Sequence, residues 1–274
     1  MILNVNELYE KIKKDLKETI DNKEPIISLI RVGKEKSSIS FEKSIIKEAN
    51  GLNMKYISKV FETKSSREDI LKYLETQNND KNVDGILIFS PMEVDFVEML
   101  VFNHINPNKD IDGLANNNLK NLFLGDDYVN LPTTATATLE YLKSITDLKG
   151  KDILIINRSI IVGKPLALML TNEDATVTLT HSKTKNLNKK IKNSDIIISA
   201  VGNGKQFKNL SYKKGTIIID LGMNFDNGKI YGDFDKEEFI DNKDVNYLPT
   251  LGTIGRLSSL LMLRNTYLNY EKAK

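Results

Sequence analysis

Short buried strands alternate with amphipathic helices along most of this 274-residue chain, and this alternation limits the possible folds more than any other feature. Apolar runs such as Ile26–Val32 and Val83–Ser90 are typical of strands that are buried on both faces. Between such runs, apolar residues recur at helical spacing, as at Ser38–Asn50. Strands joined by helices of this length predict parallel βαβ units and therefore an α/β fold.

The pattern occurs in two series, which predicts two domains, each with a mostly parallel sheet. A helix expected at Thr133–Lys143 joins the series, and the second series begins with a strand at Asp152–Asn157. A last helix, near Leu257–Asn269, follows the second series, and we expect it to return to the first domain. The predicted domains are residues 1–143 with 252–274, and residues 144–251, the second being Rossmann-like.

Charge and composition exclude several classes of protein. The 39 Lys and Arg residues nearly balance the 37 Asp and Glu residues, and no run of six like charges occurs, so neither nucleic acid nor a membrane surface is an expected partner. The absence of cysteine and the presence of two histidines argue against a thiolate or histidine-rich metal site. With no secretory signal and no apolar run long enough to span a membrane, we expect a soluble, cytoplasmic protein.

The segment Ile155–Leu166 (IINRSIIVGKPL) has the strand, tight turn and helix that hold a phosphate on backbone N–H groups. Its spacing is not the G-x-G-x-x-G of many dinucleotide sites, because Asn157 stands where the first glycine would be. Asparagine tolerates left-handed backbone better than most residues, so the turn can survive this change. The segment by itself is a weak signal, and an ordinary βα turn remains the alternative.

The next strand end indicates which dinucleotide would bind. An acid there hydrogen-bonds the adenosine ribose of NAD, but this chain has His181, Ser182 and Lys183. Ser182 and Lys183, together with Arg158, would attract a 2′-phosphate that a carboxylate would repel. The pattern favours NADP, although Lys183 could also be a solvated surface charge and His181 a structural residue.

Several motifs in order resemble the bifunctional methylenetetrahydrofolate dehydrogenase/methenyltetrahydrofolate cyclohydrolase family over nearly the whole chain. The motifs are 106–113 (NPNKDIDG), 158–166 (RSIIVGKPL), 175–187 (ATVTLTHSKTKNL), 195–202 (DIIISAVG) and 220–224 (DLGMN), with Gly232-Asp233. The resemblance implies a folate-binding catalytic domain, an NADP domain across a cleft from it, and usually a homodimer. It also implies tetrahydrofolate derivatives as substrates.

The resemblance also assigns binding residues. The NADP contacts of the family match Asn157, Arg158, Ser159, Ser182 and Met223. The aspartate that holds the pterin matches Asp112, whose carboxylate can accept two hydrogen bonds from an amino-pyrimidine edge. A turn-forming role before the following glycine is the alternative for Asp112.

The chain departs from the family at the reaction centre, which is a Tyr-x-x-x-Lys on a helix and a Gln after a strand. Aligned from the start of the helix, Phe41 stands at the tyrosine and Ile45 at the lysine. Aligned from its end, Ile39 stands at the tyrosine and Lys43 at the lysine. Lys47 is a second candidate for the lysine, and neither lysine has a tyrosine four residues earlier. Phe89 stands at the glutamine, where a phenyl ring offers no polar contact.

Three functional hypotheses follow. The leading one is NADP-dependent oxidation of 5,10-methylenetetrahydrofolate and hydrolysis of the methenyl product to 10-formyltetrahydrofolate, with the hydrolytic step weakened by the lost tyrosine and glutamine. A catalytically silent NADP- or folate-binding relative is the second. An oxidoreductase with the same architecture and another substrate is the third; Phe89, and Arg256 at a family proline position, favour these two, whereas Asp112 favours the first.

Overall fold

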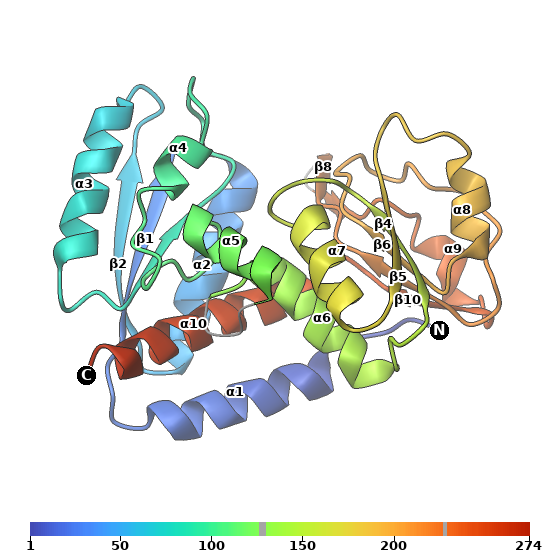
Figure 1. Cartoon of the computed structure of the whole chain (residues 1–274), viewed down its shortest axis with the longest axis horizontal. Helices are drawn as coiled ribbons and strands as arrows, with labels where there is room; N and C mark the ends of the chain where they lie inside the picture. Colours follow the sequence, from blue (N-terminus) through green and yellow to red (C-terminus); the bar gives the residue numbers. More distant parts are fainter. Residues whose placement is uncertain (126–129, 227–228) are drawn as a thin grey trace. The chain divides into compact units, whose positions relative to one another are not determined.

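The computed structural model describes residues 1–125, 130–226 and 229–274, and the chain divides into two compact units (Figure 1). We name each unit after its parallel sheet. The three-strand unit comprises Tyr9–Thr133 and Ser258–Lys274. The five-strand unit comprises Met1–Leu8 and Thr134–Leu257. No helix in the described ranges is long and apolar enough to cross a bilayer.

In the three-strand unit, the described residues form a parallel sheet in the order β2-β1-β3. Its strands are β1 (Ile26–Val32), β2 (Lys55–Phe61) and β3 (Gly85–Ile88). The helices of the unit, some of which continue into the other unit, are α1 (Asn6–Ile20), α2 (Lys36–Gly51), α3 (Arg67–Asn79), α4 (Met99–Phe102), α5 (Asn116–Leu124) and α10 (Ile254–Lys272). The central strand β1 is almost wholly buried, whereas β2 is an edge strand with mostly exposed side chains.

Helix α10 packs closely against the start of β3. A Cβ atom on Gly85 would lie 2.6 Å from Thr266 Oγ1 and 2.7 Å from Ile111 Cγ2. Only glycine leaves room for this approach, so the small residue at the start of β3 lets the helix cover the sheet.

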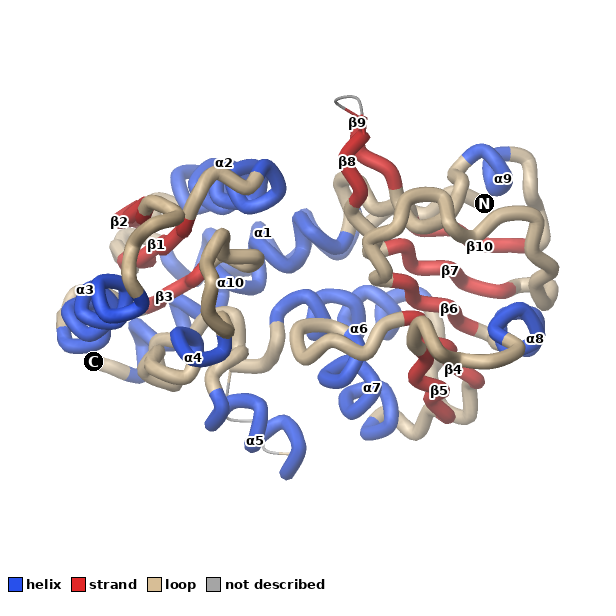
Figure 2. Tube along the Cα trace, turned by 90° about the horizontal axis from the view of Figure 1, so that it is seen from above, coloured by secondary structure: helices blue, strands red, loops and turns tan. Residues whose placement is uncertain are grey.

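In the five-strand unit, the described strands form a parallel sheet in the order β10-β7-β6-β4-β5 (Figure 2). The strands are β4 (Asp152–Ile156), β5 (Thr176–Thr180), β6 (Ile196–Ser199), β7 (Thr216–Asp220) and β10 (Val245–Leu248). The remaining elements are α6 (Thr133–Ile145), α7 (Gly163–Asn172), α8 (Leu187–Asn193), α9 (Glu237–Ile240) and the antiparallel hairpin of β8 (Asn224–Asp226) and β9 (Lys229–Tyr231).

The order of this sheet reverses at β4. The chain passes from β4 to β5 on one side and then returns to place β6 on the other side. In open α/β sheets, ligands bind at the carboxyl ends of the strands at such a switch point. The predicted α/β fold, with a parallel sheet in each half and a Rossmann-like second half, is therefore confirmed, and it places the turn after β4 and the loop after β6 at one crevice.

Candidate active site and dinucleotide site

Asn157 closes the turn after β4 with its side chain. Its Oδ1 atom accepts hydrogen bonds from the backbone N–H groups of Ser159 (2.7 Å) and Gly163 (3.1 Å). Its Nδ2 atom donates to the carbonyl oxygen of Ala200 (2.6 Å), in the loop after β6. Asn157 does not adopt a left-handed backbone, so the expected reason for its tolerance was wrong. Asn157 closes the turn because its one side-chain amide bonds both to the turn after β4 and to the loop after β6.

Gly163 begins helix α7 and is required by the same turn. A Cβ atom there would lie 2.3 Å from the carbonyl oxygen of Asn157. Ser159 supports the turn as well, because its Oγ accepts from the backbone N–H of Val162 (3.1 Å). The sequence therefore forms a compact strand–turn–helix without the usual first glycine.

A cavity of about 380 Å³ lies at the carboxyl end of β4 and brings together three predicted cofactor residues, Asn157, Arg158 and Ser182. The other residues that line it are Ile156, His181, Leu187, Val201, Asn203, Gln206 and Phe207. Arg158 and Ser182 are exposed and carry polar groups that can meet an anion. Ser159 is not among the lining residues, and its observed contact is within the turn.

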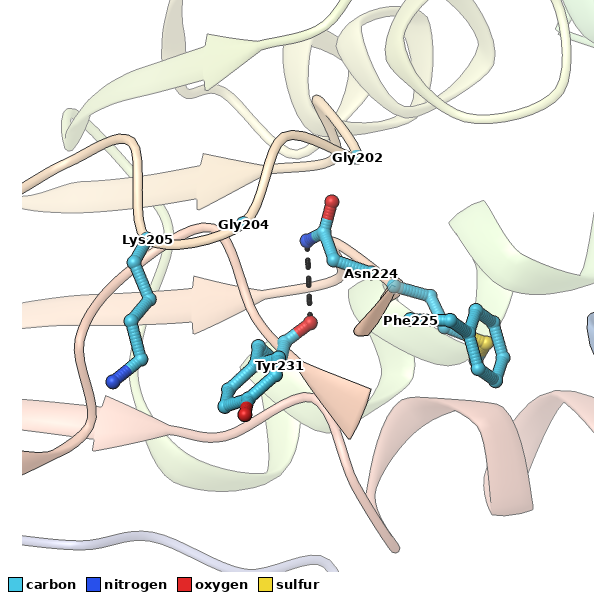
Figure 3. A pocket seen from close by; sticks show the side chains of 7 residues that line it. Gly202, Gly204, Lys205, Asn224, Phe225 and Tyr231 are labelled. Carbon is cyan, nitrogen blue, oxygen red and sulfur yellow. Dashed lines mark hydrogen bonds between the residues drawn. The ribbon is translucent and has the colours of Figure 1, made fainter. Parts of the chain in front are cut away.

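Met223, the fifth predicted cofactor residue, lines a second cavity of about 620 Å³ (Figure 3). The other lining residues are Gly202, Gly204, Lys205, Asn224, Phe225 and Tyr231. Asn224 Nδ2 donates to the carbonyl oxygen of Tyr231 (3.2 Å) and so ties the two strands of the β8–β9 hairpin together. The loop 201–204 contributes residues to both cavities, so four of the predicted cofactor residues line two cavities that share this loop.

The three-strand unit brings together two phenyl rings that were predicted to stand at polar positions of the family. Phe41, on α2, and Phe89, directly after β3, meet edge to face with their centroids 6.1 Å apart and their planes at 88°. Ile45 is fully buried one turn further along the helix. The aligned positions of tyrosine, lysine and glutamine are thus occupied by Phe41, Ile45 and Phe89 when the helix is aligned from its start.

Lys43 and Lys47 are exposed on α2. The buried face of this helix carries Glu42, whose Oε2 accepts from Arg31 Nε (2.8 Å) and whose Oε1 accepts from Ser58 Oγ (2.6 Å). Because Glu42 turns toward the sheet, its neighbour Lys43 and the lysine one turn later lie away from it. The structure therefore brings Phe41 and Phe89 together and leaves both lysines outside that contact.

Asp112 lies toward the carboxyl end of β3, because Asp110 runs beside Ile86 in a parallel bridge. Its carboxylate is half-buried and accepts a hydrogen bond from the Thr133 hydroxyl. Burial, followed by the charge of Asp110, raises the pKa of Asp112 to about 7, while the Thr133 hydrogen bond opposes the shift. The group can therefore change its charge near neutral pH.

Sequence analysis missed Asp110 and Thr133 as supporting residues. Asp110 is buried and accepts from the backbone N–H of Gly113 (3.0 Å), that of Ala115 (2.7 Å) and Asn118 Nδ2 (2.8 Å). These bonds fix the loop that carries Asp112. The motif NPNKDIDG contains both aspartates, but its pattern does not show which one is buried and which one faces a ligand.

Two α/β units, each with a parallel sheet, and cavities at the switch point of the second sheet are typical of a dinucleotide-dependent enzyme of two domains. Two family models match the chain. The catalytic domain of tetrahydrofolate dehydrogenase/cyclohydrolase matches residues 3–112, and the NAD(P)-binding domain of the same enzymes matches residues 132–274. The chain therefore belongs to the tetrahydrofolate dehydrogenase/cyclohydrolase family.

Individual relatives agree with this assignment. The chain is 38% identical over 271 residues to the bifunctional protein FolD of Clostridium botulinum (strain Okra / Type B1), covering 96% of each chain. It is 36% identical over 277 residues to the protein of the same name from Thermosipho africanus, covering 99% of each. The crystal structure of the bifunctional FolD enzyme from Campylobacter jejuni superposes with a TM-score of 0.91 at 32% identity, covering 99% of both chains.

Proposed function

We propose that this chain oxidises 5,10-methylenetetrahydrofolate to 5,10-methenyltetrahydrofolate with NADP, and that it hydrolyses the product to 10-formyltetrahydrofolate only slowly. Family membership and the two cavities at the carboxyl ends of the strands of the five-strand sheet support the oxidation. NADP, when bound, supplies the hydride acceptor. The contact between the Phe41 and Phe89 rings is the observation that carries the slow hydrolysis.

Hydrolysis of a methenyl bridge needs a positioned group that gives or takes a proton, and such a group contributes about 10²–10⁴-fold to the rate. Phe41, Ile45 and Phe89 can exchange no proton. Oxidation depends mainly on holding the donor carbon in orientation, and apolar side chains can help to do that. Replacing the three polar groups therefore weakens hydrolysis more than oxidation.

Asp112 is the proposed pterin-binding residue. Its carboxylate offers two acceptor oxygens to an amino-pyrimidine edge. Asp110 fixes the loop that carries Asp112, and the Thr133 hydroxyl donates a hydrogen bond to one carboxylate oxygen of Asp112. In this proposal residues 1–143 with 252–274 bind the folate and residues 144–251 bind NADP.

The preference for NADP over NAD rests on the end of β5. No carboxylate follows this strand, and Ser182 lines the same cavity as Arg158. A hydroxyl and a guanidinium suit a 2′-phosphate, which an acid would repel. By the resemblance to the family we also propose a homodimer in the cytoplasm, and analytical ultracentrifugation tests the dimer.

Two assays on the same preparation test the function. One follows NADPH formation from methylenetetrahydrofolate, and the other follows the loss of methenyltetrahydrofolate without NADP. NADPH formation with hydrolysis near the uncatalysed rate supports the proposal. Binding of both ligands without either reaction identifies a catalytically silent relative. The loss of polar groups at Phe41 and Phe89 is compatible with this outcome. NADP binding without folate binding identifies an oxidoreductase with another substrate, and Arg256 at a proline position is the feature that favours it.

A further inference from the structure

The loop after β6 lines both cavities of the proposed dinucleotide site. Val201 and Asn203 line the smaller cavity, whereas Gly202 and Gly204 line the larger one (Figure 3). All four residues are exposed, and the loop contains no regular secondary structure. Something other than the loop's own packing must therefore hold it in place.

A single buried carboxylate holds this loop. Asp233 is 0% exposed and accepts backbone hydrogen bonds from Val201 (2.7 Å), Gly202 (3.0 Å) and Asn203 (3.2 Å). It also accepts from the hydroxyl of Ser199 (2.5 Å), the last residue of β6. Three consecutive N–H groups thus converge on one side chain that comes from some 30 residues further along the chain.

These bonds also determine which backbone groups of the loop are available to a ligand. The N–H groups of residues 201–203 point at Asp233, so they do not bind a phosphate. The loop contributes shape and position, and its position depends on Asp233.

A second buried aspartate places Asp233 itself. Asp220, at the end of β7, accepts from the backbone N–H of Asp233 (2.9 Å) and from that of Gly222 (3.1 Å), next to Met223. Tyr247 donates its hydroxyl to the same carboxylate (2.9 Å). The two aspartates therefore connect the loop after β6 to the turn that carries Met223, and both segments line the larger cavity.

We propose that Asp233 is a positioning residue of the NADP site, acting through the loop 201–204 without touching the cofactor. This inference rests on the proposed function, because it assumes that the two cavities receive NADP. Asparagine at position 233 would keep the size of the side chain but would turn an amide NH₂ group toward backbone donors, and the loop would lose part of its support.

The test is calorimetric binding of NADP and steady-state kinetics of the full-length wild type, Asp233→Asn and Ser199→Ala. We expect Asp233→Asn to raise the Kd and the KM for NADP at least tenfold, while kcat and the KM for methylenetetrahydrofolate stay within about twofold. Ser199→Ala removes one of the four donors and should raise the Kd for NADP about threefold. If Asp233→Asn does not fold, Ser199→Ala decides the question.

Asp84→Asn is the matched control. Asp84 is also a buried carboxylate that accepts a backbone hydrogen bond, from Ile26 (2.8 Å), but it lies in the three-strand unit at the start of β3. This variant should lose stability and keep its affinity for NADP. NADP affinities of Asp233→Asn and Ser199→Ala equal to that of the wild type would overturn the inference alone. A wild type that binds no NADP would overturn the proposed function and the inference together.

Discussion

The proposed dinucleotide site and the proposed reaction centre of this chain differ in how far they depend on particular side chains. In the five-strand unit, Asn157 replaces a glycine and still closes the turn, because backbone geometry and a few amide contacts are enough to shape a dinucleotide site. In the three-strand unit, Phe41 and Phe89 pack edge to face, and in our proposal they replace proton-handling and hydrogen-bonding groups. Binding through the backbone survives side-chain replacement, whereas proton transfer requires particular side chains at particular positions.

Among the single substitutions, the largest expected effect sharpens this comparison at Asp112, the acid proposed to hold the pterin. Asp112→Ala should weaken folate binding by about 10- to 150-fold, since hydrogen bonds to a charged group contribute about 1.5–3 kcal/mol and each 1.4 kcal/mol is a factor of ten. The affinity for NADP should stay the same, and calorimetry with each ligand measures both. A parallel loss of both affinities would show that the variant is damaged as a whole.

The next effect is the pH dependence that Asp112 should give to folate binding. The pKa of Asp112 is raised from its ordinary value of 3.8 to about 7, mainly by burial. If the ionised form accepts the pterin hydrogen bonds, folate affinity should fall about tenfold for each pH unit below 7 and level off above it. Asp112→Asn should bind more weakly with a flat profile. A wild-type profile that is flat between about pH 5 and 8 would contradict the assigned role.

Protein stability should change with pH in the direction opposite to folate affinity. The folded state holds the proton of Asp112 more tightly than the unfolded state, so this group favours folding below its unfolded pKa. Its contribution to the free energy of unfolding is lost as the pH rises from about 4 through 7. Chemical denaturation of wild type and Asp112→Asn should therefore diverge across this range, with the variant less sensitive to pH. If the free energy of unfolding depended on pH in the same way in both proteins, Asp112 would titrate normally.

A smaller effect concerns the cofactor. Arg158→Ala should reduce the preference for NADP over NAD by roughly tenfold, the effect of one charge-assisted contact to the 2′-phosphate. Binding of both nucleotides to wild type and variant, measured at one ionic strength, gives the ratio. Equal affinities of the wild type for NADP and NAD would remove the basis of the assignment.

The smallest effects are expected at the two exposed lysines. Lys47→Met should leave both reactions within about twofold of the wild type, because Lys47 lies on the side of α2 opposite the buried Glu42. If one lysine supplies residual hydrolysis, it is Lys43, which keeps the family's distance to the end of the helix. Separate rates for Lys43→Met and Lys47→Met distinguish the two, and a loss confined to Lys47→Met would reverse this choice.

The sequence predicted the elements whose signal is local. The expected strand Ile26–Val32 coincides with β1, and the βα turn at Asn157 lies where the motif placed it. The hairpin of β8 and β9, helices α4, α5 and α9 and strand β10 were not predicted, because they are short and carry little periodicity.

The register of α2 could not be predicted for a different reason. Charged side chains are expected to face solvent, but Glu42 is buried because Arg31 on the neighbouring strand pairs with it. Helix periodicity does not reveal such a partner on a neighbouring strand, so the sequence alone allows both Phe41 and Lys43 as alignments. Asp233 shows the same limit: its motif is recognisable in the sequence, whereas its partners lie some 30 residues away.

The most direct test of the central claim is the ratio of methenyl hydrolysis to NADPH formation in the wild type, compared with that of a relative carrying the family's tyrosine, lysine and glutamine. We predict a ratio about 10²–10⁴-fold lower in this chain, because Phe41, Ile45 and Phe89 transfer no proton. A ratio equal to that of the relative, and unchanged by Lys43→Met and Lys47→Met, would contradict the account and would show that another group performs the hydrolysis.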